Sequence, residues 1–310
     1  MRVAVLCGGR SAEREVSLRS GSQVAAALLS CGHEVDTVDA DAQLWERLRD
    51  GRFDAVFIAL HGRLGEDGTV QGLLELLGLP YTGSGVLASA LCIDKSRTNR
   101  VLASAGLAVP EFCEVSGEPA ESLIDRLGLP LVVKPIREGS TLGLTIARNV
   151  DEVASGVLLA RRYDRRVMAQ RFVAGVEITM GVLATPELQV LPSLEITYEN
   201  ETYDYDAKYS AGRSHHIIPA RISSEAAERA LAATATAFGA LGCEGMARVD
   251  FIVDEGGTPW LLEVNTVPGL TEVSLLPDAA RAADISFERL CQRLLDQGLA
   301  RQRQQVGPAA

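Results

Sequence analysis

The chain has 310 residues, 47% of them hydrophobic, which is enough for a large core and suits two or three domains better than one. Its formal net charge is -11, and no run of lysine and arginine forms the basic stripe that duplex binding requires, so we expect small-molecule substrates and no nucleic-acid partner. No segment reaches the ~18 consecutive apolar residues of a membrane span, and the first apolar run is too short for a signal peptide. We therefore expect a soluble, cytoplasmic protein with no membrane partner.

The cysteines are scattered along the chain without a CxxC motif or a cluster with histidine at the spacing of metal ligands. We expect them to be reduced, mostly buried small hydrophobic residues, and none is a candidate nucleophile. They are Cys7, Cys31, Cys92, Cys113, Cys243 and Cys291.

Residues 1–94 alternate between strand-like and helix-like stretches, which predicts an α/β domain with a parallel sheet. The turns "GGRSAEREVS" (8–17) and "HGRLGEDG" (61–68) follow the first and third predicted strands. Both would lie at the carboxyl ends of the strands, where open α/β sheets bind ligands.

Two α+β units follow the first domain. Residues 95–178 begin with a helix and continue as short strands and helices around the glycine-bearing loop "REGSTLG". Residues 179–310 are rich in strands and end in an amphipathic helix, after which we expect a disordered tail from residue 302.

The segment "RVDFIVDEGGTPWLLEVN" (248–265) predicts a β-hairpin with a two-residue turn at Gly256-Gly257. That turn places Asp250 opposite Glu263 and Arg248 opposite Asn265, and all four side chains share one face because strand side chains alternate. Val249 would pair with Val264, and Phe251 with Leu262, on the other face.

Two carboxylates opposite each other in an apolar hairpin repel unless a cation lies between them. One interpretation is an exposed polar face on which Arg248 neutralises Asp250. The apolar runs of a covered sheet favour a hard divalent ion instead, most simply magnesium, held by Asp250, Glu263 and Asn265. Because magnesium usually accompanies phosphate, this site predicts a nucleotide nearby.

The stretch "LVVKPIREGSTLGLTIA" (131–147) is the candidate phosphate loop. Glycines allow backbone N–H groups to approach an anion, Ser140 and Thr141 add hydroxyl donors, and Lys134 adds a charge. A solvated hairpin is the alternative, and Lys95, at the start of a helix, is a weaker candidate. No P-loop motif is present. The GxGxxA pattern at residues 83–88 leaves a dinucleotide-binding dehydrogenase as a minor alternative, since no acid follows about 20 residues on.

Several motifs together resemble the ATP-grasp superfamily: Lys95, the loop after Lys134, "RVDF" and "LLEVNTVPGLT". Further motifs, from "GGRSAEREVS" and "ALHGRLGEDGTVQGLLELLGLPYTGSG" to "YDYDAKY" and "PGLTEVSLLP", resemble the D-alanine–D-alanine ligase family in order from residue 2 to about residue 295. The resemblance implies a three-domain ATP-grasp architecture, ATP and two magnesium ions that manganese can replace, and a homodimer.

The reaction that this resemblance implies joins two D-alanines for peptidoglycan synthesis. The γ-phosphate of ATP would pass to the carboxylate of the first D-alanine, and the amine of the second would displace phosphate from the acyl phosphate. Because an acyl phosphate hydrolyses in water, the site needs a lid, for which the polar segment 205–216 is a candidate.

The resemblance also implies roles for individual residues. Glu13, linked to Ser140 and Tyr209, would hold the first ammonium, and Arg248 with the N–H of Gly269 would stabilise the oxyanion. The substrates would also meet His61, Lys208 and Ser274. ATP would contact Lys95, Lys134, Ser140, Thr141, Gln170, Arg171, Val173 and Glu177. Alone, Glu13 could instead pair with Arg14, and Ser274 could cap a helix.

The chain departs from the family pattern at a few positions. Gln170 and Arg171 stand where Glu and Lys are common, which bears on nucleotide preference, and Thr141 and Val267 stand where serine is frequent. Tyr209 favours the dipeptide over an ester product.

Two other functions compete with this one: an ATP-grasp ligase that joins another carboxylate to another amine, and a nucleotide-binding regulator without catalysis.

Overall fold

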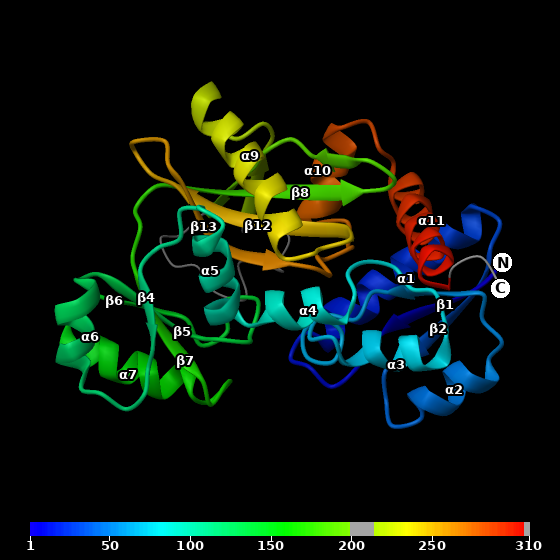
Figure 1. Cartoon of the computed structure of the whole chain (residues 1–310), viewed down its shortest axis with the longest axis horizontal. Coiled ribbons are helices and arrows are strands. Elements are labelled where there is room, and N and C mark those ends of the chain that lie inside the picture. The colour runs from blue at the N-terminus through cyan, green and yellow to red at the C-terminus, as the bar shows by residue number, and fades with distance from the viewer. Residues whose placement is uncertain (199–213, 307–310) are drawn as a thin grey trace.

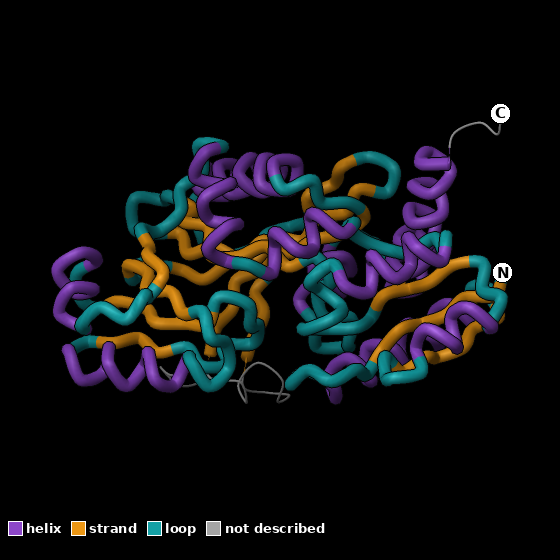
Figure 2. The backbone as a smooth tube through the Cα atoms, turned by 60° about the horizontal axis from the view of Figure 1, so that its bottom comes forward, coloured by secondary structure: helices purple, strands orange, loops and turns teal. Residues whose placement is uncertain are grey.

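The computed structural model describes residues 1–198 and 214–306. Three sheets follow one another along an elongated molecule, with the parallel sheet at one end and the four-stranded sheet at the other (Figure 1). The six-stranded sheet lies between them, and the tube view gives the same order (Figure 2).

The N-terminal sheet is parallel, as the alternating sequence predicts, with the order β2 (Glu34–Asp39), β1 (Arg2–Cys7) and β3 (Ala55–Ile58). The central strand is apolar because it is covered on both faces, and Val3 to Leu6 are fully buried. The helices of this region are α1 (Arg14–Ser30), α2 (Leu44–Asp50), α3 (Thr69–Leu77) and α4 (Val86–Ile93).

The four-stranded sheet is antiparallel, in the order β4 (Phe112–Glu114), β7 (Val167–Arg171), β5 (Leu131–Pro135) and β6 (Thr145–Ala147). Helices α6 (Ala120–Leu127) and α7 (Val150–Ala160) pack on it. The predicted helix at Lys95 is α5 (Lys95–Ser104), and Asp94 caps it by accepting a hydrogen bond from the N–H of Arg97.

The six-stranded sheet is built around β8 (Val176–Ala184) and β12 (Gly245–Val253). Its other strands are β9 (Leu188–Val190), β10 (Leu194–Tyr198), β11 (Ser214–Ile217) and β13 (Pro259–Asn265). The helices of this half are α9 (Ser224–Ala240), α10 (Leu275–Ala282) and α11 (Phe287–Val306), so the tail expected to be disordered from residue 302 is helical as far as Val306.

Three apolar clusters form the core. One joins the parallel sheet to α10 and α11, so the end of the chain packs on its beginning. A second joins α4 and α5 to the six-stranded sheet and α9, and the third lies within the four-stranded sheet and its two helices. Domain boundaries at residues 94 and 178 stay a prediction.

The hairpin register is confirmed where the polar residues lie: Arg248 pairs with Asn265, Val249 with Val264, and Asp250 with Glu263. The turn prediction is wrong. Asp254 accepts from the N–H of Gly257 (2.8 Å) and Val253 pairs with Pro259, so the turn is one residue longer. A β-bulge between Asp250 and Phe251 restores the register, and Phe251 therefore pairs with Leu261 instead of Leu262.

The GxGxxA pattern does not form a dinucleotide site. Gly85 precedes α4, and a methyl group on Gly245 would lie 3.0 Å from the Cα of Gly83, so the loop is packed against β12. Arg301 also donates to the carbonyl of Gly83 (2.7 Å). These contacts hold the loop against β12 and α11.

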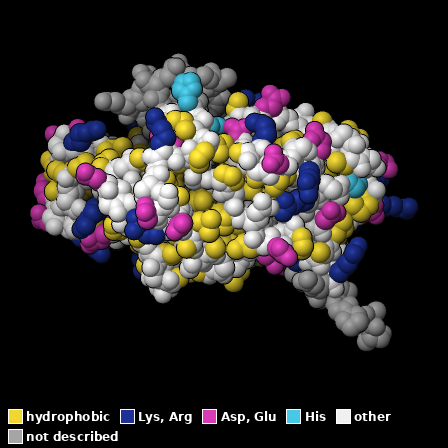
Figure 3. Space-filling model, turned by 90° about the horizontal axis from the view of Figure 1, so that it is seen from above, with side chains coloured by type: hydrophobic (Ala, Val, Ile, Leu, Met, Phe, Trp, Pro, Cys, Tyr) yellow, Lys and Arg dark blue, Asp and Glu magenta, His cyan; other side chains and the backbone are white. Residues whose placement is uncertain are grey.

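All six cysteines are free, and every one except Cys31 is buried. No helix in the described ranges is both long and apolar enough to cross a membrane. On the face that Figure 3 presents, basic and acidic side chains are intermixed outside the grey atoms, and no continuous basic stripe crosses it.

Candidate active site

Two adjoining cavities contain most of the predicted site residues that the structure describes. The first cavity is lined by Glu13, Val16, His61, Glu66, Gly139, Ser140, Ile196, His216, Arg248, Glu263, Asn265, Val267, Gly269, Thr271, Val273, Ser274 and Leu275. The second cavity is lined by Lys95, Lys134, Pro135, Glu138, Gly139, Thr141, Leu142, Leu144, Glu177, Asp250, Leu262 and Glu263. Glu263 and Gly139 belong to both, so the cavities meet between β13 and the loop after β5.

Glu13 lies at the N-terminal end of α1, where the helix dipole favours a negative charge. The hydroxyl of Ser140 donates to its Oε1 atom, which joins the first strand–helix turn to the loop after β5. The guanidinium of Arg14 binds Asp39 instead (2.9 Å), which removes the basis of the alternative Glu13 pairing. Ser140 and Thr141 have φ values of 53° and 63°. Residues other than glycine rarely adopt this left-handed conformation, and it is concentrated at functional sites.

His61 is buried and oriented by two hydrogen bonds. Its Nδ1 atom lies 3.1 Å from the carbonyl of Val267 and must therefore carry a proton, and its Nε2 atom lies 2.9 Å from the hydroxyl of Ser20. Ser20 accepts from the N–H of Leu270 (3.3 Å) and can donate to the ring. Burial lowers the pKa of His61, which favours the neutral ring.

Glu66 is a site residue that the sequence interpretation missed. It comes from the turn after β3, lines the first cavity and lies 3.9 Å from Nδ1 of His61. Burial, followed by the charge of Glu13, raises its pKa to about 8. Its position in "HGRLGEDG", at the carboxyl end of a parallel strand, was the available signal.

Arg248 and Asp250 form a buried fork. Nε of Arg248 lies 2.9 Å from Oδ1 of Asp250 and Nη2 lies 2.7 Å from Oδ2, and the two residues are 9% and 7% exposed. Thr179 donates to the same Oδ1 atom (2.6 Å). The predicted neutralisation of Asp250 by Arg248 is therefore present, but on a buried face that lines the cavities and not on an exposed one.

Two lysines carry positive charge into the second cavity. Nζ of Lys95 donates to the carbonyl of Glu138 (2.7 Å) and lies 3.1 Å from Oε2 of Glu263. Burial, followed by the charge of Lys95, lowers the pKa of Lys134 to about 8. Two ammonium groups near each other create a positive region that suits a polyanion.

Two of the predicted nucleotide-binding residues have a buried polar atom without a hydrogen-bond partner within the described part of the chain: the hydroxyl of Thr141, which lines this cavity, and Nε2 of Gln170. Buried donors are normally satisfied, so both indicate a ligand or water. The bulge at Asp250 also turns Leu262 toward the same cavity as Glu263.

The other predicted nucleotide-binding residues differ in whether they line the second cavity. Glu177 of β8 lines the second cavity, whereas Arg171 is exposed and donates to Glu111 (2.7 Å). Val173 lies in the connection between β7 and β8 and is partly exposed.

Gly269 and Ser274 line the far side of the first cavity. Ser274 precedes α10, yet its hydroxyl does not cap that helix and accepts from the N–H of Thr271 instead (2.9 Å). A methyl group on Gly269 would lie 2.7 Å from this hydroxyl, so only glycine fits without displacement. Lys208 and Tyr209, and most of the candidate lid, lie outside the described residues.

The hairpin face has the donor chemistry of a magnesium site. Asp250 and Glu263 are cross-strand neighbours, and Asn265 follows on the same face with its Oδ1 atom 2.9 Å from the N–H of Val267. The described residues contain no group of three or more His, Cys, Asp or Glu placed to hold a metal. Magnesium commonly takes only one or two carboxylates and completes its shell with phosphate and water, so these oxygens fit it.

Comparison with known proteins identifies relatives over nearly the whole chain. The family models "D-ala D-ala ligase N-terminus" and "D-ala D-ala ligase C-terminus" match residues 39–84 and 101–296. The D-alanine–D-alanine ligase of Moorella thermoacetica is 48% identical over 96% of this chain and 99% of its own length. That of Desulforudis audaxviator is 50% identical over 95% and 97%.

Solved structures agree with the sequence relatives. D-alanine–D-alanine ligase from Bacillus anthracis, crystallised with ATP, superposes with a TM-score of 0.86 at 32% identity and covers 99% of this chain and 100% of its own. A D-Ala:D-Ser ligase from Enterococcus faecalis gives a TM-score of 0.81 at 30% identity, covering 96% and 99%. The chain therefore belongs to the D-alanine–D-alanine ligase family and has the ATP-grasp fold that its motifs predict.

Proposed function

We propose that this protein joins two D-alanines into D-alanyl-D-alanine at the cost of one ATP, for peptidoglycan precursors. The observation that carries the proposal is the pair of cavities that meet at Glu263 and Gly139. One contains groups suited to an amino acid, and the other contains lysines suited to phosphate. The names of the relatives supply the substrate, and the geometry supplies the place where its carboxylate and the γ-phosphate would meet.

ATP would occupy the second cavity. Lys95 and Lys134 neutralise its phosphates, the backbone of the loop at Ser140 and Thr141 adds donors, and Gln170 offers its buried amide to the base. Arg171, Val173 and Glu177 would complete the nucleotide contacts. Phosphoryl transfer needs positioning and charge neutralisation more than a covalent group, and the cavity supplies both.

Asp250, Glu263 and Asn265 would hold magnesium, in two sites as the family resemblance implies, with manganese able to replace it. When bound, the metal would neutralise charge on the transferring phosphate. Asp250 and Glu263 would also orient Arg248 and Lys95, whose charged groups they contact.

The first cavity would hold both amino acids. Glu13, with Ser140 and Tyr209, would bind the first ammonium, and His61 would lie beside the same substrate as a neutral ring. Lys208 and Ser274 would bind the carboxylate of the second D-alanine. Together these six side chains would fix which carboxylate faces the phosphate.

The reaction balances without a further reactant. A carboxylate oxygen of the first D-alanine attacks the γ-phosphorus, and ADP leaves. The free amine of the second D-alanine then attacks the carbonyl carbon of the acyl phosphate and gives a tetrahedral oxyanion, and its nitrogen loses one proton, which the departing phosphate takes up. Arg248 and the N–H of Gly269 would stabilise this charge until phosphate leaves with the carboxylate oxygen.

We also propose a homodimer, a cytosolic location where ATP is available, and the domain boundaries at residues 94 and 178. Size-exclusion chromatography with light scattering tests the first of these. None of the three is needed for the chemistry above.

Phosphate release from ATP and magnesium tests the function, with D-alanine, L-alanine or no amino acid added and the product identified by mass. We expect release only with D-alanine, matched by formation of the dipeptide. Release with a different carboxylate and amine pair would support another ligase, and ATP binding without any product would support a regulatory protein.

A further inference from the structure

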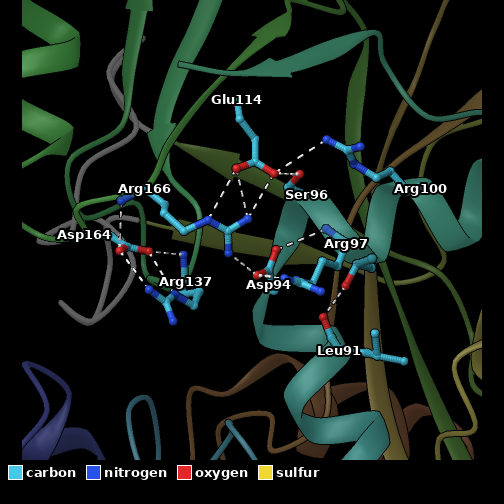
Figure 4. A network of polar contacts seen from close by, with 10 residues as sticks. Leu91, Asp94, Ser96, Arg97, Arg100, Glu114, Arg137, Asp164 and Arg166 are labelled. Carbon is cyan, nitrogen blue, oxygen red and sulfur yellow. Dashed lines mark hydrogen bonds and ion pairs between the residues drawn. The ribbon is translucent and has the colours of Figure 1, made fainter. Parts of the chain in front are cut away.

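A cluster of charged side chains outside both cavities joins α5 to the four-stranded sheet (Figure 4). Arg166, in the turn before β7, donates to Asp94 at the start of α5 and to both carboxylate oxygens of Glu114 on β4 (3.0 Å each). Glu114 also accepts from the hydroxyl of Ser96 (2.7 Å). Arg166 is thus tied to the residues on either side of Lys95, directly to Asp94 and through Glu114 to Ser96.

The backbone makes the same connection. The N–H of Lys95 donates to the carbonyl of Ile136 (3.2 Å), and the N–H of Ile136 donates to the carbonyl of Arg166 (3.1 Å). Ile136 comes two residues after Lys134. The side chain of Arg166 and two backbone hydrogen bonds therefore connect the segments that carry the two lysines of the second cavity.

The two lysines lie on elements that pack in different apolar clusters. Lys95 begins α5, which packs with the six-stranded sheet, whereas Lys134 lies on β5, whose apolar cluster contains only residues between Cys113 and Ala169. Arg166 bridges this junction. The bridge is partly buried: the side chain of Asp94 is 6% exposed and that of Arg166 is 31% exposed. Arginine suits the position because its planar fork can serve two carboxylates at once, whereas lysine offers a single point.

We infer that Arg166 is a positioning residue that holds Lys95 and Lys134 at the spacing required by the nucleotide phosphates. This inference rests on the proposed function, in which both lysines bind those phosphates. Without Arg166, Asp94 and Glu114 keep their charges but lose their shared partner. The α5 helix and the four-stranded sheet would then be held together less firmly, by contacts that include the Ser96–Glu114 hydrogen bond and the two backbone hydrogen bonds. Phosphate contacts would weaken, and contacts to the base, which do not involve either lysine, would remain.

The test compares ADP with adenosine in calorimetric titrations of the full-length protein. We expect Arg166→Met to raise the Kd of ADP roughly tenfold to hundredfold, as a small misplacement of binding groups does, and to leave the Kd of adenosine within about twofold. The KM of ATP should rise while the KM of D-alanine stays the same. Arg166→Lys should lie between the wild type and Arg166→Met.

A matched control is Arg221→Met, because Arg221 makes the same kind of fork with Glu195 (2.6 and 3.0 Å) elsewhere on the six-stranded sheet. It should bind both ligands as the wild type does. If Arg166→Met fails to fold, Arg166→Lys and Glu114→Gln carry the same comparison.

The variant Lys134→Met distinguishes an error in the proposed nucleotide site from an error in the positioning role of Arg166. If it leaves ADP affinity unchanged, the proposed nucleotide site is wrong and the inference falls with it. If Lys134→Met weakens ADP binding but folded Arg166 variants do not, the proposed nucleotide site is supported and the positioning role of Arg166 is refuted. An equal loss of affinity for ADP and for adenosine in Arg166→Met would also refute the positioning role, because it would mean that the whole nucleotide site is loosened.

Discussion

The raised pKa of Glu66 predicts how the free energy of unfolding changes with pH. Burial and the charge of Glu13 raise its pKa from 4.5 to about 8, so its ionised form is disfavoured in the folded protein. At about 1.4 kcal/mol for each unit of pKa, this difference corresponds to a few kcal/mol. Because the folded-state pKa is the higher one, the contribution to stability is complete below about pH 4.5 and is lost as the pH rises toward 8. Glu66→Gln removes this loss.

Urea unfolding at pH 5, 6.5, 8 and 9 measures the effect. The free energy of unfolding of Glu66→Gln minus that of the wild type should increase by a few kcal/mol between pH 5 and 8 and then level off. Glu46→Gln, which changes an exposed carboxylate on α2, controls for the loss of one acid and should give a flat difference. A flat difference for Glu66→Gln would refute the buried, protonated carboxyl.

Three further variants, one of them a double substitution, test the site and the core. Asp250→Asn together with Glu263→Gln should abolish turnover in a protein that still folds, and an unchanged rate and magnesium dependence would contradict the hairpin site. Gly269→Ala should lower kcat by about 100-fold, because its methyl group would lie 2.7 Å from the hydroxyl of Ser274 and shift the N–H, with ADP affinity unchanged in calorimetry. Phe251→Ala should lower the free energy of unfolding in urea by roughly 3–5 kcal/mol, because this side chain is fully buried, and a cost below 1 kcal/mol would contradict its place in the core.

The sequence predicts those parts of the site whose arrangement follows from the alternation of side chains along a strand. Arg248, Asp250, Glu263 and Asn265 share a face because side chains alternate along a strand, and this result survives an error in the turn. The extra turn residue and the bulge each shift the register by one, and the two shifts cancel. A prediction based on Gly256-Gly257 alone cannot detect either of them, because the αL glycine of a three-residue turn and the bulge leave no distinct pattern in the sequence.

The predicted link between Glu13 and Ser140 is present, but contacts between distant segments that no motif marks could not be predicted. Glu66 lies in a quoted motif, but its raised pKa depends on burial under residues that come from elsewhere in the chain. Arg166 has no motif, and its role depends on Asp94 and Glu114, which lie 72 and 52 residues away. The conformation of Thr141 is likewise visible only in the folded loop, because a threonine with positive φ is not expected from its residue type.

The measurement that tests the central claim most directly follows the carboxylate oxygen. The enzyme is incubated with ATP, magnesium and D-alanine labelled with 18O in its carboxylate, and the released phosphate is examined by mass spectrometry. Transfer through an acyl phosphate predicts one labelled oxygen in each phosphate and one dipeptide for each ATP. Unlabelled phosphate would mean that water attacks ATP directly, and the role assigned to the junction of the two cavities would be wrong.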